Sequence, residues 1–304
     1  MIVVAGENVV DLISQPDGDL RPALGGGPAN IAVAAARLGA PVAMAARLGS
    51  DIFGTAFRRR LTDAGVDGRH LRQSGDPSTL ALTTINAAGV PLFDFWHSGA
   101  ADFGWSGAEL PAIHPGDIVH VGSLAAFLPP GADALERWVT ANRPLCTVTF
   151  DPNLRPISLA QPGALDRLER LVDIAHVVKV SQDDLEMAYP DTDPVDTARR
   201  WRDEHGVGLV LLTRGAGGVT AFRADGEESA PAPEVSVADT IGAGDSLMAA
   251  VLDCLRRGGE VDLDFVCAVA ALACTRPGAD PPTAAEVSAF LAASPAARRS
   301  PAPE

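Results

Sequence analysis

The stretch Asp239-Thr240-Ile241-Gly242-Ala243-Gly244-Asp245-Ser246 stands directly before a run with the apolar spacing of an amphipathic helix. Gly242, Ala243 and Gly244 carry little or no side chain, so the backbone of this turn can approach a ligand closely. The first N–H groups of a helix have no partner within the helix, and the helix dipole favours an anion there. The sequence therefore predicts a phosphate-binding turn that needs no lysine.

Asp245 falls in the first turn of this predicted helix, beside the expected phosphate site. A carboxylate in that position suits a general base that takes the proton of an alcohol as the alcohol attacks a γ-phosphate. Considered alone, the same residues are equally consistent with an ordinary first-turn acid and a plain glycine turn. The choice between the two depends on the rest of the chain.

A second glycine-rich turn, Gly25-Gly26-Gly27-Pro28-Ala29-Asn30, precedes a helix of small residues near the N-terminus. Pro28 suits the first turn of that helix, and Gly39 lies just past its end. Considered alone, this turn is also consistent with a tight connection between two elements.

The two turns resemble, in the right order, the two signatures of the pfkB, or ribokinase-like, carbohydrate kinases, the second of which reads Asp-Thr-x-Gly-Ala-Gly-Asp. The resemblance covers nearly the whole chain. It implies that Asp245 is the catalytic base and that the amides of Gly242, Ala243 and Gly244 meet the transferred phosphate. The N-terminal turn is closer to those of fructokinases and 2-keto-3-deoxygluconate kinases than to that of ribokinases, which has a lysine among its glycines.

Composition narrows the range of partners. The chain of 304 residues has a formal net charge of −15, which argues against nucleic acid or an anionic membrane surface as a partner. Its single lysine, Lys179, follows no glycine-rich loop, so a Walker-type P-loop is excluded. Without a signal-peptide pattern or a membrane-spanning apolar run, we expect a cytoplasmic protein. The cysteines show no metal-ligand spacing and are expected to be buried free thiols: Cys146, Cys254, Cys267 and Cys274.

Strand-like and helical runs alternate along most of the chain, which predicts a mostly parallel sheet with helices on both faces. Two β-prone runs at residues 79–86 and 91–97 are typical of a hairpin outside that sheet. With the resemblance, this predicts an α/β, ribokinase-like three-layer fold with a small β lid. Strands are expected at residues 2–5 (continued by 7–12), 42–48, 117–122, 146–150, 177–180 and 209–212, and helices at 31–38, 132–141, 265–274 and 284–292.

The expected domain organisation is simple. Residues 1–293 are predicted to form one pfkB-type kinase domain, with its lid strands within 8–24 and 78–105. Residues 294–304 are polar and contain proline, which is typical of a disordered tail.

The resemblance also implies a sugar site. Asp11 matches a family aspartate that binds sugar hydroxyls, although it could otherwise cap a turn. The run Asp151-Pro152-Asn153-Leu154-Arg155-Pro156 resembles the consensus of fructokinases and 2-keto-3-deoxygluconate kinases. It follows a buried strand, where ligands bind in open α/β sheets, but a strand exit with a solvated arginine gives the same pattern. The expected substrate-binding residues are Asp11, Gly26, Gly27, Asn30, His97, Asp151, Asn153 and Arg155.

A nucleotide site is implied by two further matches. Residues 213–218 resemble the family's Thr-x-Gly-x-x-Gly nucleotide turn, whereas their spacing is not a full dinucleotide fingerprint. Residues 181–186 align with the family's Asn-x-x-Glu element, which organises Mg²⁺ and phosphates through water, but they also fit a capped helix start. The resemblance thus implies ATP at Ser181, Thr213, Gly215 and Gly218, Mg²⁺ through water at Asp184, and a monovalent cation such as K⁺ at Asp239.

We therefore expect a carbohydrate kinase that transfers phosphate from ATP to a primary hydroxyl of a small sugar, with fructose as the first choice. Arg155 or Arg214 would stabilise the transition state in place of a P-loop lysine. Ketodeoxygluconate kinases typically carry an arginine where this chain has His97, and an arginine can bind a carboxylate with two parallel hydrogen bonds. His97 therefore favours a neutral sugar.

Several alternatives stay open at this point. Within the family these are 2-keto-3-deoxygluconate kinase, ribokinase and nucleoside kinase. A sugar-binding regulator without catalysis could have the same fold, although an intact Asp245 favours an enzyme. We also expect a homodimer, because the edge of the lid sheet can pair with a second chain.

Overall fold

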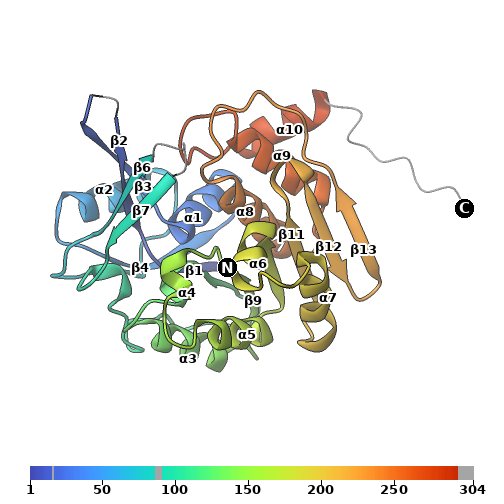
Figure 1. The fold of residues 1–304 in the computed structure, drawn as a ribbon, viewed down its shortest axis with the longest axis horizontal. Coiled ribbons are helices and arrows are strands. Elements are labelled where there is room, and N and C mark those ends of the chain that lie inside the picture. The colour runs from blue at the N-terminus through green and yellow to red at the C-terminus, as the bar shows by residue number, and fades with distance from the viewer. Residues whose placement is uncertain (16, 86–90, 294–304) are drawn as a thin grey trace, which may run out of the picture.

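The central sheet is built around the apolar N-terminal strand. The computed structural model describes residues 1–15, 17–85 and 91–293. Within them, nine strands form this sheet in the spatial order β13 (Gly226–Ala230), β12 (Val219–Arg223), β11 (Leu209–Thr213), β10 (Val177–Ser181), β9 (Thr147–Asp151), β8 (Ile118–Gly122), β1 (Ile2–Ala5), β4 (Val42–Leu48) and β5 (Leu71–Gln73) (Figure 1). The strands from β5 to β11 are parallel, whereas β12 and β13 are antiparallel, so the prediction of a mostly parallel sheet is confirmed.

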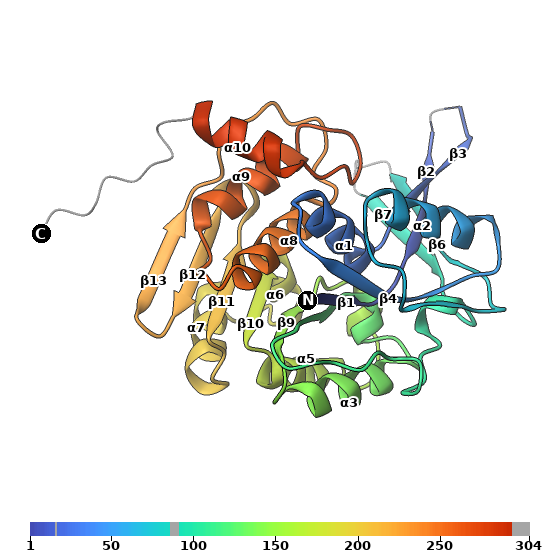
Figure 2. The same cartoon turned by 180° about the vertical axis from the view of Figure 1, so that it is seen from behind.

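Helices cover both faces of this sheet, as Figures 1 and 2 show. Strand β1 sends Ile2 and Val4 into one buried cluster and Val3 and Ala5 into the other, as the alternation of side chains along a strand requires. The first cluster is closed by α1 (Gly27–Arg37), α2 (Ile52–Asp63), α8 (Ala243–Arg256), α9 (Leu263–Ala273) and α10 (Ala284–Ala293). The second is closed by α3 (Ala132–Asn142), α5 (Ala164–Ile174), α6 (Gln182–Ala188) and α7 (Pro194–Glu204).

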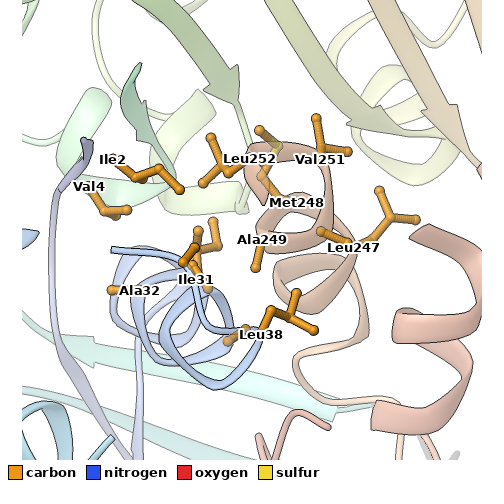
Figure 3. Close-up of a cluster of buried hydrophobic side chains, with 14 of the residues drawn as sticks. Ile2, Val4, Ile31, Ala32, Leu38, Leu247, Met248, Ala249, Val251 and Leu252 are labelled. Atoms are coloured by element: carbon orange, nitrogen blue, oxygen red, sulfur yellow. The ribbon is translucent and has the colours of Figure 1, made fainter. Parts of the chain in front are cut away.

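Helices α1 and α8 pack together over β1, as Figure 3 shows. Ala32 of α1 and Ala249 of α8 are fully buried in this cluster, together with Ile31 and Met248. Side chains this small let two helices approach closely, and a close-packed interior resists added volume. The packing therefore fixes the first turns of the two helices relative to one another.

A four-stranded sheet forms the lid, in the order β3 (Leu20–Gly25), β2 (Val9–Ser14), β6 (Thr79–Ile85) and β7 (Pro91–Trp96). The prediction that residues 7–12 continue the first strand was wrong. Strand β1 ends at Ala5, and β2 belongs to the lid, where it pairs with β3 and β6. An apolar run indicates a strand but not the sheet that the strand joins. The predicted tail, residues 294–304, lies outside the described residues.

Asp102 joins the places where the chain enters and leaves the lid. Its Oδ1 accepts a hydrogen bond from the Asn8 N–H, 2.8 Å away, just before β2 begins. Its Oδ2 accepts from the N–H (3.2 Å) and the hydroxyl (2.7 Å) of Thr79, the first residue of β6. Asp102 is 1% exposed, and burial raises the pKa of its carboxyl group. This buried side chain therefore holds the base of the lid together.

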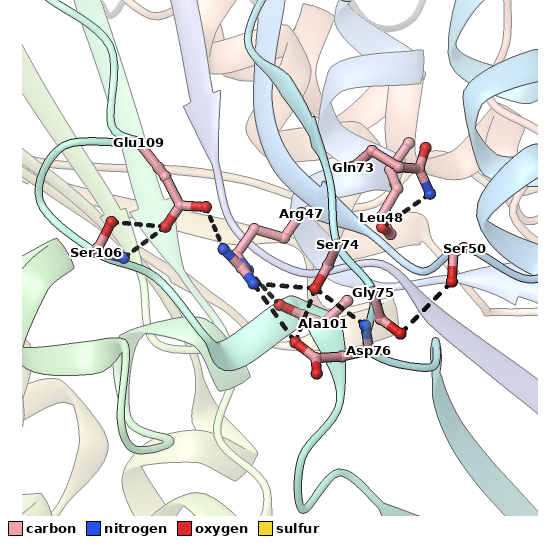
Figure 4. Close-up of polar contacts among 10 residues, drawn as sticks. All are labelled: Arg47, Leu48, Ser50, Gln73, Ser74, Gly75, Asp76, Ala101, Ser106 and Glu109. Atoms are coloured by element: carbon pink, nitrogen blue, oxygen red, sulfur yellow. Dashed lines mark hydrogen bonds and ion pairs between the residues drawn. The ribbon is translucent and has the colours of Figure 1, made fainter.

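Arg47 of β4 ties the same base to the central sheet (Figure 4). Its Nε donates to the Ala101 carbonyl at 2.8 Å, and its Nη2 donates to the Ser74 hydroxyl at 3.0 Å. The guanidinium also pairs with Glu109 and lies 3.5 Å from Asp76. The segments before β6 and after β7 are thus fixed to one side chain of the main sheet.

Asp102→Ala should destabilise the protein because it leaves buried donors of Asn8 and Thr79 without an acceptor. We expect a loss of about 2–4 kcal/mol in the free energy of unfolding, measured by urea denaturation. The matched control is Asp63→Ala, which removes an aspartate whose side chain is 69% exposed, and should change stability by less than about 0.5 kcal/mol. Equal stabilities of the two variants would contradict this role of Asp102.

Candidate active site

The site lies at the carboxyl ends of adjacent strands, where the sequence places its polar residues. Asp151, Ser181 and Thr213 are the last residues of β9, β10 and β11. The first turn of α8 meets the same edge, because a Cβ built on Gly244 would lie 3.0 Å from Nζ of Lys179 in β10. In open parallel sheets, ligands bind at this edge.

The turn before α8 has the backbone that its glycines permit. Gly242 is the N-cap, with φ of 76° and ψ of 5°, a left-handed conformation that favours glycine. Asp245 lies in the first turn, as predicted, and the first helical hydrogen bond runs from the Ser246 N–H to the Gly242 carbonyl, at 2.8 Å. The Ala243 N–H, which was expected to meet the phosphate, donates to the Thr240 carbonyl at 3.2 Å.

Asp245 is held against the N-terminal glycine turn. The Asn30 amide donates from Nδ2 to Oδ2 of Asp245 at 2.8 Å, and a Cβ on Gly27 would lie 3.4 Å from Oδ1. Burial raises the pKa of the Asp245 carboxyl, whereas the Asn30 hydrogen bond and the charges of Lys179, Arg155 and Arg60 act to lower it. The two predicted signatures therefore meet at one carboxylate.

Lys179 is a site residue that the sequence reasoning missed. Its Nζ donates to Oδ2 of Asp151 at 2.8 Å, and both side chains are almost fully buried. The ammonium lies against the first turn of α8, since it is the atom that a Cβ on Gly244 would meet. A lysine in the apolar strand Val177–Ser181 was the available signal, because lysines are rarely buried without a partner.

Asp151 therefore lies close to the first turn of α8, through its pairing with Lys179. It is 2% exposed, and burial together with the charges of Asp184 and Asp245 raises its pKa to about 6, against the opposing charge of Lys179. The sequence had placed Asp151 among the sugar-binding residues, whereas its nearest partner is the lysine behind α8.

On the sugar side, Asn153 and Arg155 lie near the glycine turn and the lid. Asn153 has a positive φ of 39°, and its Nδ2 would be 2.8 Å from a Cβ on Gly27. Burial raises the pKa of Asp11 to about 6, and the Arg155 charge opposes this rise. The Arg155 charge also acts to lower the pKa of Asp245, and its guanidinium donates to the Leu154 carbonyl at 2.7 Å. The 2.8 Å distance from Nδ2 of Asn153 shows that position 27 must be glycine, because a side chain there would collide with Asn153.

His97 follows the last lid strand. Across the lid, Asp11, Ala81 and Phe95 form one cross-strand row and so share a face. The His97 ring packs edge-on against Phe103, with ring centroids 6.2 Å apart, and burial lowers its pKa. His97 is therefore neutral near pH 7, at the base of the lid.

The residues expected to bind nucleotide occupy tight turns. Ser181 caps α6 in a reciprocal capping box with Asp184. Gly218 has φ of 84°, and a Cβ there would lie 2.0 Å from the Ala230 carbonyl oxygen, so packing against β13 alone requires this glycine. Arg214 donates to the Thr220 hydroxyl of β12. Thr213 and Gly215 lie at the start of the same turn.

The carboxylates expected near cations are already bonded to the backbone. Asp184 accepts from the N–H groups of Leu154 (2.7 Å) and Ser181 (3.1 Å), and Asp239 accepts from those of Ile241 (3.0 Å) and Gly278 (2.8 Å). Within residues 1–15, 17–85 and 91–293, three or more His, Cys, Asp or Glu side chains do not gather into a metal-binding group. Each oxygen of Asp184 and of Asp239 thus already accepts one backbone hydrogen bond.

Comparison with known proteins gives the family. The pfkB family carbohydrate kinase profile matches residues 1–285. A fructokinase of Escherichia coli is 32% identical over 260 residues, which cover 84% of each chain. The chain therefore belongs to the pfkB family of carbohydrate kinases, as its two signatures predicted, and is a sugar kinase.

Two solved structures carry the same fold. One is a fructokinase of Vibrio cholerae O395 with fructose, ADP and calcium, with a TM-score of 0.87, 28% identity, and coverage of 95% of this chain and 98% of that one. The other is an aminoimidazole riboside kinase of Salmonella enterica with its riboside and an ATP analogue, with a TM-score of 0.85, 28% identity, and coverage of 95% and 99%. The predicted ribokinase-like fold is thus confirmed.

Asp245→Asn should remove the base without removing the anion site. We expect kcat to fall on the order of 10²–10⁴-fold, with ADP affinity changed by no more than a few-fold, measured by coupled ADP release and calorimetry. Asp183→Asn is the matched control, since Asp183 is an exposed acid in the first turn of α6. Near-normal turnover of Asp245→Asn would contradict its assignment as the base.

Gly244→Val should damage phosphate transfer more than nucleotide binding. Its side chain would press on the Lys179 ammonium and crowd the first amides of α8. We expect kcat to fall on the order of 10²-fold, as for loss of one preorganised donor. Gly259→Val is the control, because a Cβ at Gly259 meets no atom within 4 Å. If both variants keep full turnover, the phosphate site lies elsewhere.

Proposed function

We propose that this sugar kinase uses ATP to phosphorylate a primary hydroxyl of a neutral sugar, with fructose as the preferred substrate. The observation that carries the proposal is the position of Asp245, which lies in the first turn of α8 and accepts a hydrogen bond from Asn30 of the glycine turn. An alcohol bound at that turn lies next to both the base and the phosphate-binding end of the helix.

The chain's own residues supply the chemistry of transfer. Asp245 takes the proton of the attacking hydroxyl, whose oxygen forms a bond to the γ-phosphorus while the bond from phosphorus to the bridging oxygen of ADP breaks. The α8 N-terminus and the Lys179 ammonium beneath it stabilise the charge on the transferred group. Arg155, whose charge reaches Asp245, is the second cation at the site, whereas Arg214 is bonded to Thr220.

The sugar is assigned to the space under the lid. We expect it to be bound by Gly26, Gly27 and Asn30 at the start of α1, by Asn153 and Arg155 after β9, and by Asp11 of the lid. ATP is assigned to the turns with Ser181, Thr213, Gly215 and Gly218. This division rests on the position of Asp245 between Asn30 and the first turn of α8.

Cations complete the assignment. Mg²⁺, when bound, would neutralise phosphate charge, and Asp184 would reach it through water because both of its oxygens already accept backbone hydrogen bonds. A monovalent cation such as K⁺ would be held by backbone carbonyls near Asp239. The support is that Asp239 joins the turn before α8 to the loop at Gly278.

The cellular location and the oligomeric state are also proposals. We assign the protein to the cytoplasm. On its net charge of −15 we expect no nucleic-acid or membrane partner. Among the described residues, the helices are too short or too polar to cross a bilayer. A homodimer through the lid is supported by exposed apolar side chains at its two edges, Leu20 (49% exposed) and Trp96 (54% exposed).

A panel of acceptors tests the substrate. We expect kcat/KM for fructose to exceed that for ribose and for 2-keto-3-deoxygluconate, measured by coupled ADP release, because neutral His97 cannot pair with a carboxylate as an arginine does. His97→Arg should raise activity on the acidic sugar if this position faces the substrate. A clear preference of the unmodified enzyme for the acid would contradict the neutral-sugar assignment.

Two further outcomes separate the alternatives. Aminoimidazole riboside belongs in the panel, because one similar structure is a kinase of that riboside, and its preference over fructose would indicate a nucleoside kinase. Sugar binding by calorimetry without ADP release from any acceptor would indicate a non-catalytic regulator instead.

A further inference from the structure

Arg60 connects helix α2 to the catalytic carboxylate through one side chain. Its Nη2 donates to Oδ1 of Asn30 at 2.9 Å, and Nδ2 of the same amide donates to Oδ2 of Asp245 at 2.8 Å. The sequence reasoning gave Arg60 no role, and it lies in the last turn of α2. The three residues form a continuous chain of hydrogen bonds from an arginine to the base.

The donors and acceptors of these three side chains set the direction of the hydrogen bonds between them. A guanidinium can only donate hydrogen bonds, and an ionised carboxylate can only accept them. The Asn30 amide must therefore turn its oxygen toward Arg60 and its nitrogen toward Asp245. The carboxylate favours the nitrogen end of the amide, and Arg60 fixes the oxygen end, so the amide is held from both sides. Loss of Arg60 removes one of these two contacts and lets the amide tilt away from Asp245.

Arg60 also contacts the loop beside the phosphate turn. Its Nη2 lies 3.3 Å from the Ala279 carbonyl oxygen, and Ala279 lies against Gly242, where a Cβ would be 3.1 Å from its side chain. One guanidinium group thus joins α2, α1 and the loop that supports the start of α8. Its Nη1 is buried and has no hydrogen-bond partner among the described residues.

The surrounding charges explain why an arginine is tolerated there. Burial lowers the Arg60 pKa, and the charges of Asp245 and Asp280 oppose that effect. Asp280 is itself paired with Arg37. The groups that act on Asp245 are Asn30 on α1, Arg60 on α2, Arg155 before α4 (Pro156–Leu159), Lys179 on β10 and Asp151 on β9.

We propose that Arg60 is a positioning residue for phosphoryl transfer: it fixes the Asn30 amide so that Nδ2 faces Asp245, and it ties this pair to the loop at Ala279. This inference rests on the proposed function, because it assigns Asp245 the role of base. An arginine that only ends α2 would instead stabilise the helix and leave Asp245 unaffected.

Kinetics of Arg60→Met test the proposal first. We expect kcat for fructose to fall about 10- to 100-fold, as for a small misplacement of a catalytic group, with KM for ATP changed by less than about twofold. Arg60→Lys keeps the charge and one donor and should recover part of kcat. Arg59→Met, on the same helix turn with a side chain that is 84% exposed, should behave as the unmodified enzyme. Thermal unfolding checks that each variant is folded.

A double-variant comparison separates positioning from general damage. If Arg60 acts through Asn30, adding Arg60→Met to Asn30→Ala should lower kcat by no more than about twofold further. Effects that multiply in the double variant would overturn the proposal, and so would a folded Arg60→Met variant with unchanged kcat. If Arg60→Met does not fold, Arg60→Lys is compared in the same way.

A titration without turnover keeps this test independent of the proposed substrate. The Asp245 carboxyl carbon can be followed by NMR and assigned through its loss in Asp245→Asn. Removal of Arg60 takes away a nearby positive charge and frees Asn30, so the Asp245 pKa should rise by on the order of one unit. The acid limb of kcat should move upward with it. An unchanged titration in Arg60→Met overturns the proposal, whereas lack of fructose turnover in the unmodified enzyme overturns only the proposed function.

Discussion

The site depends on how the first turn of α8 is held against the ends of β9 and β10. The carboxylates of Asp151, Asp184 and Asp245 lie around this turn, the first two of them buried, and like charges in the interior destabilise one another strongly. Lys179 offsets them from below, with its ammonium 2.8 Å from Asp151 and against Gly244. The charge that allows these acids to lie together is therefore also available to a phosphate at the helix end.

A second constraint acts on the lid. Its four strands form a separate sheet, so its position over the strand ends depends on a few buried polar contacts at its base. Asp102 bonds to the segments that enter β2 and β6, and Arg47 bonds to the segments before β6 and after β7. These contacts place Asp11 within reach of the Arg155 charge. The position of Asp11 relative to Arg155 therefore depends on the contacts at the base of the lid.

Elements with strong local signals were predictable from the sequence. Both ends of α2 have such a signal, Asp51 before the helix and Gly65 after it. In the structure Asp51 accepts from the first-turn N–H groups, and Gly65 has a positive φ. The apolar runs of the parallel strands were equally clear, except in β5, which reads Leu-Arg-Gln and was not predicted. Strands β12 and β13 were not predicted, because β13 reads Gly-Glu-Glu-Ser-Ala and pairs only through its neighbour. β13 becomes a strand because β12 offers it backbone hydrogen-bonding groups, not because its own residues favour a strand.

By itself, the sequence determined the family and the glycine turn that begins a helix with Asp245 in its first turn, because these residues form a pattern at fixed local spacing. Only the tertiary structure decided which distant side chains act on Asp245. Lys179 and Arg60 belong to neither signature, and they reach Asp245 from β10 and α2 across the packed interior. Charge and hydrogen bonding act through space, so their roles appear only when the chain is folded.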